Sequence, residues 1–283
     1  MDDDNHNLNS AEYAGPAPAQ GETTPIAPQL PEDIRVPWGW LDLVLLIPLT
    51  VGGLFFLVIV TFIGLALSGV AIGKIQQSPE VFGLISVAAQ TVLDLAVLGY
   101  LAMQMRVRFH SPFWRTIGWR PLESTRLSRS AICFLLGLGG FLLAIVVAWV
   151  DSLYPPKAEL PIETLLQGHA TLVLFMLTAV LVAPLVEETV FRGYLYPVAA
   201  RTFGVTGGIL ITGTLFGLMH GVQLWGGWWQ IAMLVVVGIV FTLARARTGT
   251  VVASYVLHVS YNSLQVIALL IGTHGLRHIP GAH

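Results

Sequence analysis

Charged side chains are scarce in this chain. Only 11% of its 283 residues are charged, whereas 55% are hydrophobic, and the mean hydropathy is +0.75. Soluble domains carry about 25% charged residues, so the composition excludes an ordinary soluble protein and indicates an integral membrane protein that contacts the lipid bilayer. The formal net charge of −2 gives no sign of nucleic-acid binding, and no feature of the sequence indicates an oligomeric state.

Cysteine is almost absent as well. The single cysteine, Cys133, lies within an apolar run, so an intramolecular disulfide and a cysteine-based metal site are both excluded. The chain also lacks the pattern of a secretory signal peptide, in which a charged segment precedes a short apolar run. We therefore expect the first apolar helix to remain as a membrane anchor.

The composition changes along the chain. Residues 1–38 are rich in Asp, Asn, Pro, Ala and Gln and hold seven acidic residues against one basic residue, which predicts a disordered N-terminal tail. We expect an N-terminal transmembrane region over 39–166, a region with polar motifs over 167–273 and a short C-terminal tail over 274–283.

Long apolar runs predict an all-α fold, a multi-pass transmembrane helical bundle. Crossing about 30 Å of hydrocarbon takes about 20 apolar residues. About seven spans fit, and they are 41–66, 81–103, 131–150, 172–197, 207–223, 228–244 and 251–272. An eighth span is left open in the first apolar stretch, which runs on toward Gly73, or in the loop after residue 104.

Arginines predict the orientation in the membrane. The loop 104–130 holds the densest basic cluster of the chain, which consists of Arg106, Arg108, Arg115, Arg120, Arg126 and Arg129. Cytoplasmic loops carry an excess of Lys and Arg. With seven spans, this places the N-terminus in the cytoplasm and the C-terminus outside, in what we expect to be the cell membrane.

Three polar islands interrupt the apolar runs of the C-terminal third, at 187–192, 216–220 and 258–262. Charged residues at mid-membrane cost roughly 2.5–3.5 kcal/mol each on the insertion scale, so several of them together indicate a functional site. At about 1.5 Å per helical residue, the islands lie roughly 21, 20 and 17 Å from the expected cytoplasmic ends of their helices. Three separate helices therefore bring polar side chains to nearly the same depth.

Spacing within the islands predicts which side chains pair. Glu188 and Arg192 are four residues apart, so they share a helix face and can form an ion pair. Glu187 is about 100° around the helix from Glu188 and cannot face Arg192 equally well. A carboxylate left in an apolar setting suits a general base. Pro184 removes a helix hydrogen bond just before this pair.

The motifs resemble those of a known family. Glu-Glu-x-x-x-Arg at 187–192, Phe-x-x-x-His at 216–220 and His-x-x-x-Asn at 258–262 are similar to the motif set of the CAAX-protease and bacteriocin-processing (CPBP, or Abi) intramembrane proteases. That family includes the Ras-converting CAAX endopeptidase of eukaryotes. The resemblance covers about residues 170–272, and it implies a glutamate-dependent endopeptidase with its site inside the bilayer.

Carried over to this chain, the resemblance implies roles for four catalytic residues. Glu187 and His220 would activate a water molecule that attacks the scissile carbonyl. His258 and Asn262 would supply the oxyanion hole or help to hold the site. The implied substrate is a peptide or protein in the membrane, with or without a prenyl group.

Three further residues would support the site: Glu188 and Arg192 as an ion pair, and Phe216 one helical turn before His220. Cofactor use is open. One Glu and two His, here Glu187 with His220 and His258, are also a ligand set of hydrolytic zinc sites. The chain lacks His-Glu-x-x-His, however, and a mechanism without metal is equally complete.

Two other function classes fit a polar site within a membrane. An ion-coupled transporter would use buried carboxylates such as Asp94 as relays, although the chain shows no internal repeat of the kind that marks many transporters. A non-catalytic scaffold or immunity protein would keep the same fold without the chemistry. For Asp94, at the centre of the second span, a paired structural carboxylate is the favoured interpretation.

Overall fold

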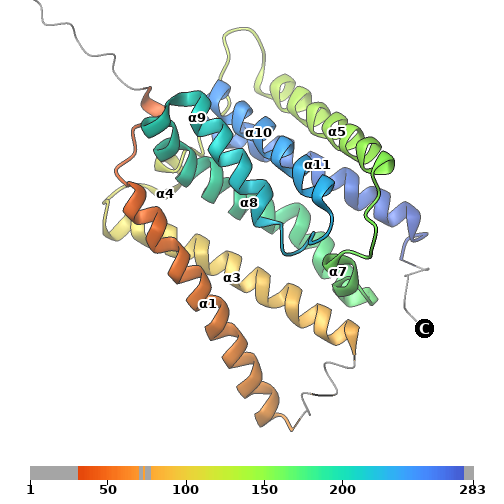
Figure 1. The fold of residues 1–283 in the computed structure, drawn as a ribbon. Helices are drawn as coiled ribbons and strands as arrows, with labels where there is room; N and C mark the ends of the chain where they lie inside the picture. The colour runs from red at the N-terminus through yellow and green to blue at the C-terminus, as the bar shows by residue number, and fades with distance from the viewer. Residues whose placement is uncertain (1–30, 70–72, 74–77, 277–283) are drawn as a thin grey trace, which may run out of the picture. The chain divides into compact units, whose positions relative to one another are not determined.

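The computed structural model describes residues 31–69, 73 and 78–276, and this part of the chain is helical without strands. The prediction of an all-α membrane bundle is confirmed. The elements are η1 (Glu32–Ile34), α1 (Trp40–Leu67), α3 (Pro79–Val107), α4 (Phe113–Thr116), α5 (Arg129–Leu153), α6 (Pro161–Leu165), α7 (His169–Leu177), η2 (Thr178–Val182), α8 (Ala183–Glu188), η3 (Thr189–Leu195), α9 (Tyr196–Met219), α10 (Trp228–Thr248) and α11 (Val251–Gly272). Figure 1 shows their arrangement.

In the part of the chain that the structure describes, six helical stretches are long and apolar enough to cross a membrane. They are Trp40–Leu67, Pro79–Val107, Arg129–Leu153, His169–Met219, Trp228–Thr248 and Val251–Gly272. Helices suit this setting because each backbone N–H and C=O finds its partner within the segment. Within the described residues neither the first apolar stretch nor the loop after residue 104 contains an eighth span.

The fourth stretch, His169–Met219, contains two of the expected spans. It is bent at Gly204, whose φ of 75° and ψ of 166° are not helical. A Cβ on Gly208 would lie 2.7 Å from the backbone of Ala200, a contact that a straight helix cannot make across eight residues. The chain therefore folds back at Gly204, and the expected spans 172–197 and 207–223 fall on the two sides of this reversal.

Gly204→Ala is expected to lower the free energy of unfolding by about 1–3 kcal/mol, because this φ/ψ region is essentially restricted to glycine. A Cβ there would meet no atom within 4 Å, so the cost is backbone strain alone. Unfolding of the purified protein in mixed micelles measures it. Gly99→Ala on α3 is the matched control, since that helical glycine also has open space around its Cβ; a loss of stability equal in both variants would contradict the strain argument.

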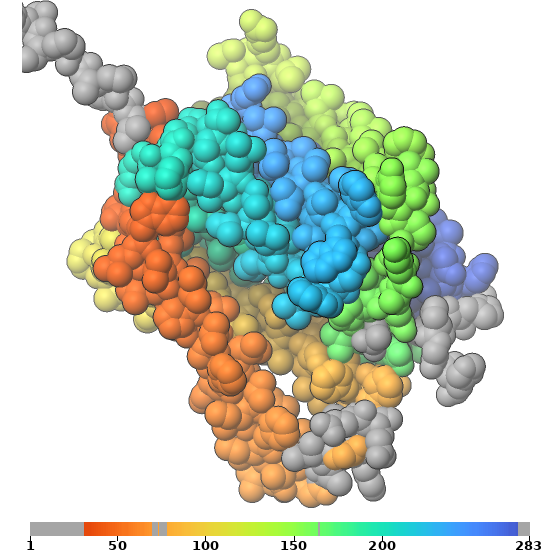
Figure 2. All heavy atoms as spheres, viewed as in Figure 1, coloured from red at the N-terminus to blue at the C-terminus, as the bar shows by residue number. Residues whose placement is uncertain are grey.

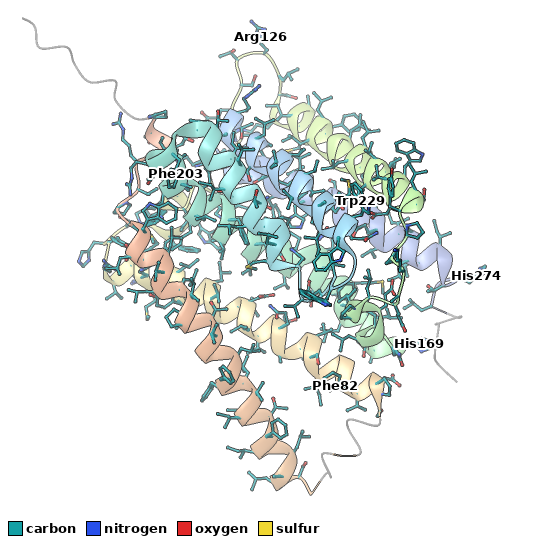
Figure 3. The ribbon with its side chains drawn as sticks, viewed as in Figure 1. Phe82, Arg126, His169, Phe203, Trp229 and His274 are labelled. Carbon is teal, nitrogen blue, oxygen red and sulfur yellow. The ribbon has the colours of Figure 1, made fainter. Side chains whose placement is uncertain are left out.

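Side chains mark the two ends of the helices. In Figure 3, Arg126 and Phe203 lie at one end, called the arginine end below, and Phe82, His169 and Trp229 lie toward the other. Because successive helices run in alternating directions between these ends, the loop 104–130 and the reversal at Gly204 share the arginine end.

The helix α1 packs loosely. Along its 28 residues only Asp42 and Leu46 are buried, and Figures 1 and 2 show its second half diverging from the other helices. Contact with α3 extends to Gly53, where a Cβ would lie 3.0 Å from the side chain of Leu93. Most of α1 is thus an apolar surface suited to lipid.

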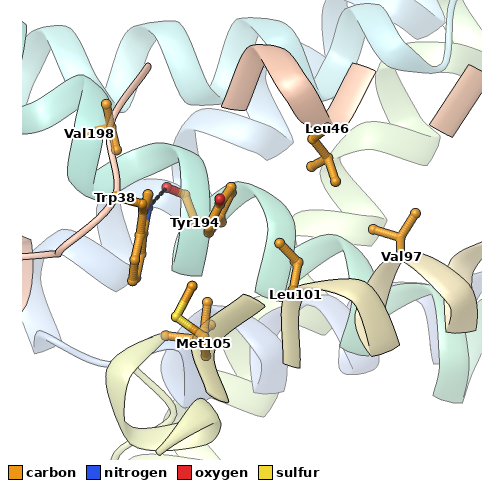
Figure 4. Packing of buried hydrophobic residues seen from close by; sticks show 8 residues of the cluster. Trp38, Leu46, Val97, Leu101, Met105, Tyr194 and Val198 are labelled. Carbon is orange, nitrogen blue, oxygen red and sulfur yellow. Dashed lines mark hydrogen bonds between the residues drawn. The ribbon is translucent and has the colours of Figure 1, made fainter. Parts of the chain in front are cut away.

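The predicted tail 1–38 needs a correction. Residues 31–38 are ordered: η1 forms a short helical turn, Ile34 is buried, and Trp38 is only 1% exposed. Trp38 belongs to a buried cluster that Figure 4 shows between α1, α3 and η3. An aromatic anchor and hydrogen bonds to the helices order this segment despite its polar composition. Residues 1–30 and 277–283 of the two predicted tails lie outside the described residues.

Candidate active site

Two adjacent carboxylates, Glu187 and Glu188, end the short helix α8. The segments on either side, η2 and η3, are π-helical. Such i→i+5 turns are rare, and they occur frequently at functional sites. The two glutamates therefore lie at the end of a short α-helical segment that has a π-helical segment before it and another after it.

Pro184 explains why the first π segment needs outside help. In an i→i+5 pattern the carbonyl of Ala179 would accept from residue 184, but proline has no N–H. Asn262 of α11 supplies the missing donor, with 2.7 Å between its amide nitrogen and the Ala179 oxygen. A buried carbonyl without a partner would be costly, so this bond holds η2 against α11.

Arg192 forms the expected ion pair with Glu188. Its Nη1 lies 2.8 Å from Glu188 Oε1, and both side chains are fully buried. The other two guanidinium nitrogens are also satisfied: Nε donates to Thr242 Oγ1 at 3.2 Å, and Nη2 donates to the carbonyl of Gly238 at 2.9 Å. A buried cation needs this complete set of partners, so Arg192 ties η3 to α10.

Aromatic rings surround the same guanidinium group. Its central carbon lies 4.4 Å from the ring centre of Phe216, 5.4 Å from that of Phe241 and 5.9 Å from that of Phe191. The negative face of an aromatic ring attracts a cation, more strongly where water is absent. Phe216 thus has a structural role that its place in the motif did not reveal.

His258 joins both glutamates. Its Nδ1 lies 2.9 Å from Glu188 Oε1, and its Nε2 lies 3.8 Å from Glu187 Oε2. Because Glu188 Oε1 already accepts from Arg192, the hydrogen in the shorter contact belongs to Nδ1. Glu188 therefore orients the imidazole so that Nε2 is directed toward Glu187.

His220 follows the last residue of α9. Its Nδ1 lies 2.9 Å from the carbonyl oxygen of Phe216, which can only accept, so Nδ1 carries a hydrogen and Nε2 is left to accept a proton in the neutral ring. The Phe216 ring lies 5.1 Å from the ring of His220 and 5.7 Å from that of His258. Phe216 thus separates the two histidines.

The structure brings most of the predicted site together. Glu187, Glu188, Arg192, Phe216 and His258 form one contact network, as the depth argument predicts. His220 is connected to this network through the backbone and ring of Phe216. Asn262 bonds the carbonyl of Ala179 in η2 instead of a member of the network.

The contribution of α10 was not predicted. Gly238, Phe241 and Thr242 contact Arg192, yet nothing in the sequence of this apolar helix suggests a polar role. The only available signal is the spacing of Gly238 and Thr242, since small residues four apart allow close helix packing. A Cβ on Gly238 would lie 2.5 Å from the carbonyl oxygen of Gly213 on α9.

The suggested zinc ligands are Glu187, His220 and His258. Within residues 31–69, 73 and 78–276, no group of three His, Cys, Asp or Glu side chains is arranged to hold a metal ion. His220 and His258 both direct Nδ1 at protein oxygens, which leaves Nε2 of each ring as the atom that could bind a metal, and Nε2 of His258 lies 3.8 Å from Glu187 Oε2.

Asp94 has a partner on its own helix. Gln90 donates to its Oδ1 at 2.7 Å, and the neighbouring Thr91 contacts Thr178 of η2 at 3.1 Å. The hydrogen bond to Gln90 agrees with a paired structural carboxylate.

Comparison with known proteins adds one finding. Residues 169–264 match the model of the family described as type II CAAX prenyl endopeptidase, Rce1-like. No curated protein and no solved structure matches the chain. The match begins at the first residue of α7, ends within α11 and contains all three polar islands, so it confirms the resemblance that the motifs carry. Residues 169–264 are therefore similar to the family described as type II CAAX prenyl endopeptidase, Rce1-like.

Proposed function

We propose that the protein is an intramembrane endopeptidase that cleaves a peptide bond of a membrane-associated or lipidated substrate. The observation that carries this proposal is the orientation of His258: Glu188, itself paired with Arg192, holds its Nδ1 so that its Nε2 is directed at Glu187. A carboxylate, an oriented imidazole and a fixed counter-charge are the groups that hydrolysis of an amide uses.

The first chemical step is assigned to Glu187 and His220. Glu187 is the more accessible of the two glutamates, with 23% of its side chain exposed against none for Glu188. A water molecule beside Glu187 would lose a proton to the carboxylate as its oxygen attacks the scissile carbonyl carbon. His220 presents an accepting Nε2 for the same water and would complete its activation.

The second step returns the proton. When the C–N bond breaks, the proton held by Glu187 would pass to the leaving amine, so the carboxylate ends as it began. The oxyanion of the tetrahedral intermediate would face Nε2 of His258, which would donate to it with the ring carrying a hydrogen on both nitrogens. Asn262 would hold the site, because its amide nitrogen is engaged by the carbonyl of Ala179.

The positions of the arginines support a proposal for the orientation in the membrane and for the side from which a substrate enters. We infer that the arginine end faces the cytoplasm, since Arg126 lies there in Figure 3 and the loop 104–130, the reversal at Gly204 and the end of α10 hold further arginines, namely Arg115, Arg201 and Arg247. A substrate would then carry its scissile bond into the bilayer from that side. A prenylated C-terminus is one substrate of suitable chemistry, and a hydrophobic peptide precursor is another.

The decisive experiment compares new protein N-termini in membranes of cells that express the wild type or the Glu187→Gln variant at equal levels. Termini that appear only with the wild type would establish the protease and name its substrate. An identical set of termini in both membranes would contradict the proposal, and flux measurements in proteoliposomes would then test the ion-coupled transporter.

We expect metal chelators to leave the cleavage rate of the purified protein unchanged, since the described residues offer no cluster of three metal ligands. The rate is measured before and after incubation with a strong zinc chelator and dialysis. Loss of activity on chelation, restored by zinc alone, would contradict a mechanism that uses only Glu187 and His220 to activate water.

A further inference from the structure

Trp38 lies far outside residues 169–264, yet it contacts the segment that follows the two glutamates. Its indole Nε1 donates to the carbonyl oxygen of Tyr194 at 2.9 Å, as Figure 4 shows. The two rings stack with 5.0 Å between their centroids. Trp38 is 1% exposed and Tyr194 is fully buried, so this contact is shielded from both water and lipid.

The carbonyl of Tyr194 lies close to the junction between η3 and α9. It belongs to η3, whose i→i+5 pattern is visible at its end, where the N–H of Tyr196 donates to Phe191. Pro197 follows in the next turn and removes one backbone donor from this junction. An external N–H from Trp38 therefore stabilises the place where the π segment returns to α-helix.

A distant side-chain donor is also present on the other side of the glutamates, and there it replaces the N–H that a proline lacks. There the donor is Asn262, the carbonyl is that of Ala179 in η2, and the proline is Pro184. Each π segment is thus followed by a proline and held by one side-chain donor from a distant part of the chain. Asn262 belongs to the third polar island and lies within the matched residues 169–264, whereas Trp38 lies outside them.

We propose that Trp38 is a positioning residue for the active site and acts through η3, whose Tyr194 carbonyl it bonds. By fixing the Tyr194 carbonyl it sets the rotation of η3, which carries Arg192 two residues earlier. Arg192 in turn holds Glu188, and Glu188 orients His258. This inference rests on the proposed protease activity for its kinetic test.

Hydrogen bonds also hold the backbone on either side of the Trp38 indole. Arg201 of α9 donates through Nη1 to the carbonyl of Val36 and through Nη2 to the carbonyl of Trp38, both at 2.9 Å. The N–H of Gly39 donates to Asp42 at 2.9 Å. The backbone around Trp38 is therefore fixed against α9 and α1, and the hydrogen bond to Tyr194 can transmit that position to η3.

The test removes the indole N–H and keeps an aromatic ring. Trp38→Phe is expected to lower kcat by roughly 10–100-fold, the size of effect that a small misplacement of catalytic groups produces, with KM within about twofold of the wild type. The matched control is Trp40→Phe, because the Trp40 indole also donates at 2.9 Å, but to Thr202 Oγ1 at an exposed site. It should retain kcat. Equal kcat in both variants would overturn the proposal.

A second measurement does not depend on protease activity. A hydrophobic carbodiimide labels carboxylates within membranes, and mass spectrometry locates the label. The wild type should be labelled at Glu187 and protected at Glu188, which is fully buried. Trp38→Phe should make Glu188 reactive while the midpoint of thermal unfolding stays close to that of Trp40→Phe.

The outcomes distinguish the positioning role of Trp38 from the proposed protease activity. If Trp38→Phe alters the labelling of Glu188 and the wild type shows no cleavage, the positioning role is supported and the protease activity is contradicted. Unaltered labelling, or labelling that rises only as far as unfolding does, would overturn the positioning role whether or not the wild type cleaves.

Discussion

Glu187→Gln is expected to reduce the cleavage rate by roughly 10²–10⁴-fold, the contribution typical of a general base, while the free energy of unfolding falls by at most about 1 kcal/mol. The amide keeps the size of the carboxyl group but cannot take a proton from water. The stability effect is small because Glu187 is partly exposed and its ion-pair contact with His258 is long, at 3.8 Å.

The measurement combines single-turnover cleavage with unfolding in mixed micelles, both on purified protein. Asp151→Asn serves as the control, since Asp151 is also a carboxylate on a spanning helix and accepts only a long hydrogen bond from Gln230, at 3.5 Å. It should cleave at the wild-type rate. A Glu187→Gln variant with unchanged activity would remove Glu187 from the mechanism.

Arg192→Met is expected to lower the free energy of unfolding by about 3–5 kcal/mol, because it leaves the carboxylate of Glu188 buried without its counter-charge. The methionine fills much of the volume among the aromatic rings, so the loss is mainly electrostatic. Glu188→Gln should cost a similar amount, since it leaves the guanidinium group unpaired. Equilibrium unfolding in mixed micelles measures both.

The double variant Arg192→Met with Glu188→Gln gives the sharper test. With both charges gone, no uncompensated ion remains in the apolar interior, and part of the lost stability should return. Two single losses that simply add in the double variant would show that the charges are not coupled. Activity should stay low in all three variants, because each changes Glu188, which orients His258, or Arg192, which holds Glu188.

Helical periodicity was sufficient to predict the centre of the site. The spacing of Glu188 and Arg192 predicts their ion pair, and the counted depths predict that His258 from another helix reaches the same level. These predictions succeed because an apolar background makes each polar side chain conspicuous and a long helix has few ways to place it.

Other residues around the site could not be predicted from the sequence. Thr242 and Gly238 resemble ordinary small residues of a membrane helix, and only the three-dimensional packing shows that they receive two of the hydrogen bonds of Arg192. Trp38 lies beside a polar segment whose composition predicts disorder, although its ring is buried among residues distant in sequence. Composition averages over a segment and so cannot detect a single anchoring side chain.

The hydrogen bonds of the N-terminal segment span most of the chain. Asp33 bonds Arg245, 212 residues later, and Trp38 bonds Tyr194, 156 residues later. Chains are made from the N-terminus at about 5–20 residues per second, so Trp38 leaves the ribosome many seconds before its partner exists. The bonds that hold residues 31–38 against the helices can therefore form only after residues 194 and 245 have been made, so this segment takes up its place after the helices it contacts.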